Sequence, residues 1–263
     1  MKENKTYKEE ARTALKGNWP QAVLATVVLM LVAVACEGFY LLWSFKHAAE
    51  APASGDVQAA MAYMGSASRA MLLMYALMIL VFGPLLVGFI NALKELLFAG
   101  DGKVVRNSFK IGYGNYWHHV WGYLLKNIFI FLWTLLLVIP GIIKSLSYAM
   151  TNYILVDCPE LSANQAINLS KDMMYGRKFD LFYLYLSFIG WILLSIVTLG
   201  IAMLWAYPYI QTAQASFYRD VKEDYERRMN AAPVQPAPAP VQPPVTPTVS
   251  KAENPEDYMP KSE

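Results

Sequence analysis

Long apolar runs dominate the chain, and short polar segments separate them. The runs cover residues 21–45, 70–93, 120–139, 141–156, 181–198 and 201–218. A helix of about 20 apolar residues crosses the roughly 30 Å hydrocarbon core of a bilayer, so most of these runs have the length of a membrane span. The pattern predicts an all-α protein, a polytopic transmembrane helical bundle of about six spans within residues 20–219.

Glycine and proline mark the ends of several runs. Read as one helix, residues 121–157 would be about 55 Å long, more than the roughly 40–45 Å of a bilayer with its headgroups. Pro140 lacks a backbone donor and Gly141 accepts dihedral angles that other residues resist, so the chain is expected to fold back there. Leu199 and Gly200 separate the last two runs in the same way. These breaks predict three helical hairpins.

Two further breaks lie inside runs. Gly83 and Pro84 are expected to kink the second span, and Pro208 lies within the last one. The run at 141–156 would cover only about 24 Å, which leaves two possibilities for the central hairpin. It either crosses the membrane or is re-entrant.

Two segments have the spacing of amphipathic helices. The first lies within residues 1–19, where Tyr7, Ala11 and Leu15 share one face. It is interpreted as a cytoplasmic helix that either lies on the membrane surface or is a solvated leader. The second covers residues 162–175, where Ser162 and Gln165 form a capping box, and it is expected to lie in the headgroup plane.

The end of the chain differs from the rest. Residues 220–263 begin with a charged extension and continue into a proline-rich stretch that has too few apolar residues to build a core. This segment is predicted to be a disordered or polyproline II tail. It is either a plain spacer or a binding site for a protein partner.

The distribution of basic residues predicts the orientation. Charged residues make up 16% of the sequence, whereas soluble domains carry nearer 25%. With six spans, 18 lysines and arginines fall on the side of both termini and three on the other: Lys46, Arg69 and Lys144. Basic residues collect on the cytoplasmic side, so both termini are expected there. Lys126, left inside a span, is interpreted as reaching to the headgroups.

No combination of residues indicates catalysis, and no catalytic, cofactor-binding or metal-binding residue is assigned. Cys36 and Cys158 have neither the spacing of a metal site nor that of a disulfide framework. The adjacent His118 and His119 face different ways on a helix and lack a third ligand. Ser170 is the nearest approach to a nucleophile, but the adjacent lysine and aspartate do not converge on it. The chain is therefore not expected to be an enzyme or to need a cofactor, and no nucleic-acid partner is expected.

Three polar positions inside predicted spans are functional candidates. Glu37 is the only acid of the first run, and Gln211 and Gln214 lie at the polar end of the last. Glu37 either marks a transport path or lies at the membrane interface, because Lys46 and His47 follow it closely. Gln211 and Gln214 either line a cavity or hydrogen-bond neighbouring helices.

The order of several motifs resembles a known family. IPGI at residues 139–142, PELSANQAI at 159–167 and FYRD at 217–220 occur in the order found in the DUF975 family of bacterial integral membrane proteins, and GNW and FGPLLVG fit as well. The sequence is more distantly similar to the membrane domains of some glycerophosphodiester phosphodiesterases. The resemblance implies a multi-pass protein of the bacterial cytoplasmic membrane and implies no catalytic residue.

Two functions follow from these patterns. The first is a non-enzymatic membrane protein that acts as a scaffold or organises lipid and protein partners, because it combines interfacial helices with a flexible tail. The second is a small transporter or permease, because broken helices form binding sites in some transporters.

Overall fold

The computed structural model describes residues 3–47 and 56–231, and these residues are helical apart from short connections. The elements are α1 (Asn4–Leu15), α2 (Trp19–Lys46), α3 (Val57–Leu77), the π-helix η2 (Met78–Phe82), α4 (Gly83–Ala99), α5 (Val104–Gly114), α6 (Tyr116–Leu136), α7 (Val138–Ser147), α8 (Thr151–Asp157), α9 (Ala163–Met173), α10 (Lys178–Leu186), α11 (Ile189–Val197) and α12 (Met203–Ala231). The all-α prediction is confirmed. The proline-rich part of the predicted tail lies outside the described residues.

Four helices among the described residues are long and apolar enough to cross a membrane. They are Trp19–Lys46, Val57–Ala99, Tyr116–Leu136 and Lys178–Val197. The predicted runs at 141–156 and 201–218 are not among them. The first is divided into α7 and α8, and the second is the beginning of the longer and more polar α12. The chain is thus an all-α protein whose apolar helices are compatible with a membrane protein.

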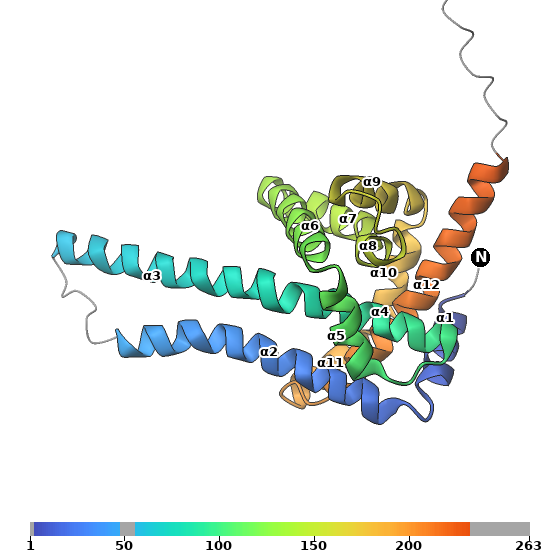
Figure 1. Ribbon diagram of the computed structural model, residues 1–263, viewed down its shortest axis with the longest axis horizontal. Helices are drawn as coiled ribbons and strands as arrows, with labels where there is room; N and C mark the ends of the chain where they lie inside the picture. Colours follow the sequence, from blue (N-terminus) through green and yellow to red (C-terminus); the bar gives the residue numbers. More distant parts are fainter. Residues whose placement is uncertain (1–2, 48–55, 232–263) are drawn as a thin grey trace, which may run out of the picture.

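The helices α2 and α3 form a long hairpin that extends from the rest of the bundle (Figure 1). The second arm begins at Val57, 13 residues before the predicted start of the span at residue 70. Asp56 explains this difference, because its side chain accepts a 2.9 Å hydrogen bond from the Ala59 N–H and so caps the helix. With η2 and α4 this arm is continuous for 43 residues, or about 65 Å at 1.5 Å per residue.

Gly83 and Pro84 stand directly after the π-helix, at the start of α4. Pro84 has no N–H to donate to the Leu80 carbonyl four residues earlier. The Tyr116 hydroxyl donates to that carbonyl instead at 2.9 Å, and the Tyr113 hydroxyl donates to the neighbouring Val81 carbonyl at 2.9 Å. Two tyrosines from the α5–α6 junction therefore supply hydrogen-bond donors to backbone carbonyls of the π-helical turn.

The turn of the central hairpin lies three residues before Pro140, which corrects the predicted position. Leu137 is extended, with φ −159° and ψ 140°, and separates α6 from α7. Pro140 and Gly141 are in the first turn of α7, where a missing N–H costs nothing. A Cβ on Gly141 would lie 2.8 Å from the Thr134 Cα, so this glycine allows α6 and α7 to approach closely.

The turn before α12 lies at the predicted place. Leu199 has φ 53° and Gly200 has φ 91°, both in the left-handed region. The chain then enters α12, which runs for 29 residues through Pro208 to Ala231.

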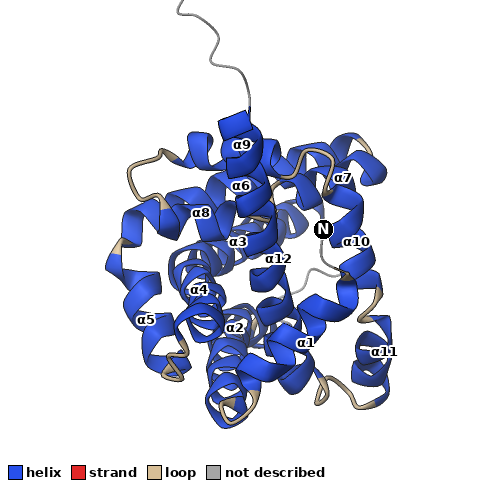
Figure 2. Cartoon of the chain, turned by 90° about the vertical axis from the view of Figure 1, so that its right-hand side faces the viewer, coloured by secondary structure: helices blue, strands red, loops and turns tan. Residues whose placement is uncertain are grey.

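Protein covers the apolar faces of both amphipathic helices. This fits neither alternative for residues 1–19, and it differs from the headgroup-plane position expected for residues 162–175. Tyr7, Ala11 and Leu15 of α1 are buried, and α1 contacts α12 and α4. The capping box of Ser162 and Gln165 is confirmed at the start of α9, whose buried face contacts α6 and α8. Figure 2 looks at the bundle from the end where α1 and α12 meet.

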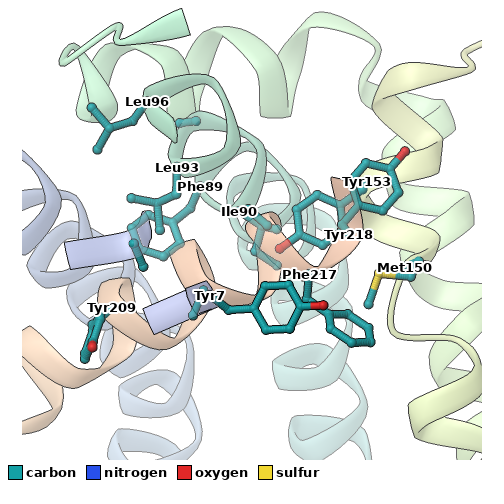
Figure 3. Packing of buried hydrophobic residues seen from close by; sticks show 14 of the residues in the cluster. Tyr7, Phe89, Ile90, Leu93, Leu96, Met150, Tyr153, Tyr209, Phe217 and Tyr218 are labelled. Atoms are coloured by element: carbon teal, nitrogen blue, oxygen red, sulfur yellow. The ribbon is translucent and has the colours of Figure 1, made fainter. Parts of the chain in front are cut away.

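Aromatic side chains fill the core between these helices (Figure 3). Tyr7 of α1 meets the Phe217 ring of α12 edge-on at 5.5 Å, and Tyr153 of α8 stacks on Tyr218 at 4.7 Å. All four side chains are at most 1% exposed. The first and last described helices are therefore joined in one core.

Candidate functional site

Buried and half-buried polar side chains lie on the neighbouring helices α4, α6, α8 and α12. We call this group the polar core, and it consists of Asn91, Lys126, Thr151, Asn152 and Gln211. The Asn91 Nδ2 donates to the Asn152 carbonyl and to the Val87 carbonyl, both at 2.9 Å. The Lys126 Nζ donates to the Asn152 Oδ1 at 2.8 Å. Asn152 of α8 thus links the polar side chains of α4 and α6.

Lys126 points into the protein and does not reach to headgroups as the sequence analysis expected. Its helix begins at Tyr116, so Lys126 is ten residues from the start, which is about 15 Å. Gly122, one turn earlier, lets α8 come close, because a Cβ there would lie 2.6 Å from a methyl carbon of Leu155. The lysine therefore finds Asn152 within reach. Asn152 is 26 positions away in sequence, so the sequence held no local signal for this pair.

Three polar atoms of the polar core are buried without a hydrogen-bond partner among the described residues. They are the Asn91 Oδ1, the Thr151 Oγ1 and the Gln211 Oε1, from three different helices. Buried polar groups are nearly always paired in native proteins, and an unpaired one costs about 1–3 kcal/mol. Ordered water or a small polar molecule would satisfy these three atoms. The polar core can therefore offer both an ammonium donor and free oxygen acceptors.

Tyrosines surround the polar core. The Tyr153 hydroxyl donates to the Gln211 carbonyl at 3.4 Å. The Tyr123 ring lies 5.3 Å from the Lys126 Nζ. Because a phenol both donates and accepts hydrogen bonds, these side chains can bind either a donor or an acceptor group of a polar ligand.

The structure divides the predicted polar positions between three places. Gln211 belongs to the polar core. The Gln214 Nε2 instead donates to the Ala149 carbonyl at 3.5 Å, which ties α12 to the turn before α8. Glu37 is exposed and lines a separate cavity between α2, α3 and α6, together with Asn127 and Tyr123.

One predicted hinge borders the polar core. A Cβ on Gly83 would lie 2.7 Å from the Tyr123 Cδ1, so the tyrosine ring packs on the glycine directly after the π-helix. Pro84 follows it in α4. π-Helical turns occur frequently at functional sites.

A second predicted hinge, Pro208, lies inside α12, one turn before Thr212. Its carbonyl accepts a 2.7 Å hydrogen bond from the Thr212 hydroxyl.

A network of ion pairs holds α1, α10 and α12 together. The Tyr7 hydroxyl donates to the Asp220 Oδ2 at 2.6 Å, and the Arg177 guanidinium donates to the same oxygen at 2.8 Å. Arg177 also donates to Asp180 at 2.9 Å. Burial alone would raise the pKa of Asp220, but the hydrogen bonds from Tyr7 and Arg177 outweigh it and lower that pKa. Nearby, Glu10 of α1 pairs with Arg219 at 2.5 Å and accepts from the Ser216 hydroxyl.

A second network joins α4, α8 and α12. Asp157 accepts from Lys94, from the Tyr218 hydroxyl at 2.8 Å and from Lys222 at 3.3 Å. Burial raises the pKa of Asp157, but the hydrogen bond and the charge of Lys94 outweigh it, so the pKa lies below its usual range. Lys94 is 7% exposed, which shows that this pair is an interior contact.

The adjacent histidines do not form a metal site with other residues that the structure describes. His119 is 3% exposed, and its Nδ1 lies 2.8 Å from the Gly112 carbonyl, to which it donates as the N–H tautomer. The His119 ring lines a cavity of about 530 Å³, together with Glu95 and Asp101. Within residues 3–47 and 56–231 there is no group of three histidine, cysteine or acidic side chains that could hold a metal ion.

The cysteines and the candidate nucleophile also have ordinary environments. Cys36 and Cys158 are both free thiols. The buried Ser170 hydroxyl donates to the Ser147 carbonyl at 2.9 Å and accepts from the Met150 N–H at 3.2 Å. Ser170 therefore satisfies the backbone of the turn between α7 and α8.

The comparisons with known proteins give one match, to a family model that covers residues 123–225. Neither the curated proteins nor the solved structures gave a match, and the distant similarity to glycerophosphodiester phosphodiesterases has no support from them. The family match contains Lys126, Asn152 and Gln211 of the polar core, and Asp157, Arg177 and Asp220 of the ion-pair networks. The family itself is described as a protein of unknown function. The motifs GNW and FGPLLVG lie before the matched residues. Residues 123–225, from the first half of α6 to the charged part of α12, match the DUF975 family and contain the motifs IPGI, PELSANQAI and FYRD.

Proposed function

We propose that this protein is a small permease that binds a polar solute in the polar core. The observation that carries this proposal is the direction of Lys126, whose half-buried side chain donates to Asn152 on the neighbouring helix α8. A charged side chain within a membrane segment is costly, and such residues generally mark substrate or ion pathways. If the contact between the helices were purely structural, a leucine at this position would cost less free energy than a lysine.

The chemistry of the polar core limits the solute. Lys126 supplies a cationic donor, whereas the free atoms of Asn91 and Gln211 are acceptors. The solute would therefore carry an acceptor or negative group beside a hydrogen-bond donor. Amino acids, hydroxy acids and similar small molecules have this combination.

The architecture that we propose has both termini in the cytoplasm of a bacterial cell. The direct contact between α1 and α12 supports their location on one side of the membrane. The 18 to 3 distribution of lysine and arginine supports the cytoplasmic side. We further propose that α7–α8 and the first half of α12 complete the second and third hairpins, which gives six crossings.

A ligand screen on the purified full chain tests the proposal. The melting temperature is measured in detergent against a panel of small anionic, cationic, zwitterionic and neutral solutes. We expect one class to raise the melting temperature of the wild type and of Lys144→Met, but not that of Lys126→Met. That solute is then used in proteoliposome flux measurements with the same three proteins. A Lys126→Met protein that binds and transports as the wild type does would overturn the proposal.

A scaffold role is the second candidate. The C-terminal end of α12 extends beyond the bundle (Figure 1). In the sequence, the proline-rich segment follows this helix. Residues 226–231 are exposed, so the end of this helix is open to a protein partner. We propose that a protein partner, and not a nucleic acid, binds non-covalently to the tail. In this role the chain itself catalyses no reaction. Affinity capture with the full chain and with a version that ends at residue 231 tests this role. Identical captured proteins from the two chains would exclude it.

A further inference from the structure

A cavity of about 600 Å³ lies between α2, α3 and α6. Its polar lining comes from Glu37 of α2, Asn127 of α6 and two tyrosines, Tyr75 and Tyr123. The other lining residues are methionine, isoleucine, leucine and phenylalanine, from α3, the π-helix and α6. The cavity is thus a mainly apolar space with one carboxylate in its wall.

Apart from the tyrosine hydroxyls, the free polar groups of this cavity are hydrogen-bond acceptors. Glu37 is exposed, and no hydrogen bond or ion pair joins it to another residue that the structure describes. The Asn127 Nδ2 donates to the Tyr123 carbonyl at 2.7 Å, which leaves the Oδ1 of the amide as its acceptor. A carboxylate and an amide oxygen together favour a ligand with a charged N–H donor.

The position of Glu37 along α2 places it near the border of the hydrocarbon. It is 18 residues after Trp19, or about 27 Å, and the hydrocarbon core is about 30 Å thick. About one to two turns further along α2, Tyr40 and Trp43 form an aromatic cluster with Tyr63 of α3, with ring centroids 6.1 to 6.2 Å apart. Such aromatic side chains typically lie at headgroup level. Glu37 would therefore face a lipid headgroup, and the apolar wall would face an acyl chain.

We propose that this cavity binds a phospholipid with a primary ammonium headgroup. The ammonium donates to the Glu37 carboxylate and to the Asn127 Oδ1, and one acyl chain lies against α3 and α6. A quaternary ammonium headgroup has no N–H to donate, and an anionic headgroup is repelled by the carboxylate. The site therefore selects among headgroups by charge and by hydrogen bonding.

Binding of a phosphatidylethanolamine with a pyrene-labelled acyl chain to the full chain in detergent tests the proposal. Unlabelled phosphatidylethanolamine, phosphatidylcholine and phosphatidylglycerol with matched chains serve as competitors. We expect only phosphatidylethanolamine to compete, and we expect Glu37→Gln to weaken binding about tenfold or more, because a charge-assisted hydrogen bond is lost. Ile128→Trp, which fills the apolar wall, is expected to weaken binding of phosphatidylethanolamine as well.

Two controls separate this site from the polar core. Asn91→Leu, a change in the polar core at a residue that does not line this cavity, is expected to leave lipid binding unchanged, and Glu9→Gln, on the exposed side of α1, reports on nonspecific charge effects. The melting temperature of each variant shows that it is folded. Equal competition by phosphatidylcholine, or unchanged binding to a folded Glu37→Gln protein, would overturn the proposal.

Discussion

The Tyr7 hydroxyl donates a 2.6 Å hydrogen bond to the Asp220 carboxylate, although 213 positions separate the two residues. Arg177 donates to the same oxygen, so a helix from each end of the chain meets the start of α10 at one acid. Tyr7 is 1% exposed and Asp220 is 7% exposed. Because the carboxylate is buried, its partners are needed to offset the loss of its hydration.

Tyr7→Phe is expected to lower the free energy of unfolding by about 1 kcal/mol, because it removes one donor from a buried acceptor. Arg177→Ala is expected to cost more, about 3 kcal/mol, because it leaves Asp220 without its cation. Thermal unfolding in detergent measures both. Tyr175→Phe is the matched control, since that ring is 77% exposed, and an equal loss in the control would contradict the interpretation.

The lowered pKa of Asp157 predicts an acid-dependent loss of stability. A carboxyl whose folded pKa lies below its unfolded value of about 3.9 stabilises the fold above that value, and the contribution is lost as the pH falls from there through the folded pKa. The melting temperature of the wild type should therefore exceed that of Asp157→Asn at pH 7, and the gap should narrow between pH 5 and pH 3. A gap that stays constant over this range would show that the charge of Asp157 does not contribute.

Lys126 and Asn152 are expected to behave as a coupled pair. Lys126→Met alone leaves the Asn152 Oδ1 without its donor, and Asn152→Leu alone leaves the ammonium without its acceptor. The double variant removes both, so its loss of stability should be smaller than the sum of the single losses by about 1 kcal/mol. A double-mutant cycle measured by thermal unfolding decides the point, and additive losses would show that the contact contributes nothing.

Gly88 and Gly190 are expected to respond with opposite signs to replacement by alanine. A Cβ on Gly88 would collide with the Ser108 carbonyl oxygen and would lie 2.6 Å from the Gly112 nitrogen, so α4 and α5 would have to separate. Gly190 has no atom within 4 Å of such a Cβ. We expect Gly88→Ala to cost about 3 kcal/mol and Gly190→Ala to be neutral or to stabilise by up to about 1 kcal/mol. Similar melting temperatures for the two variants would argue against the close packing of α4 on α5.

Local signals in the sequence predicted the features that depend on neighbouring residues. The capping box of Ser162 and Gln165 lies within one turn, and the left-handed turn at Leu199 and Gly200 needs no distant partner. The all-α fold follows from the apolar runs. The break at Leu137 was placed three residues late, because proline is tolerated in the first turn of a helix as well as in a loop.

Contacts between distant residues could not be predicted in this way. The inward direction of Lys126 depends on Asn152 in α8, and the cover of the apolar face of α1 depends on α12. An amphipathic face has the same pattern whether lipid or protein covers it. Only the arrangement of the helices distinguishes the two cases.

The contact of α1 with α12 has a consequence for biosynthesis. A ribosome completes α1 at the beginning of translation, but the acid that receives the Tyr7 hydroxyl is made only after more than 200 further residues. During that interval the apolar side of α1 has no final partner on α12. Nascent chains stalled before residue 203 should therefore expose the first helix to proteolysis, and release of the full chain should protect it.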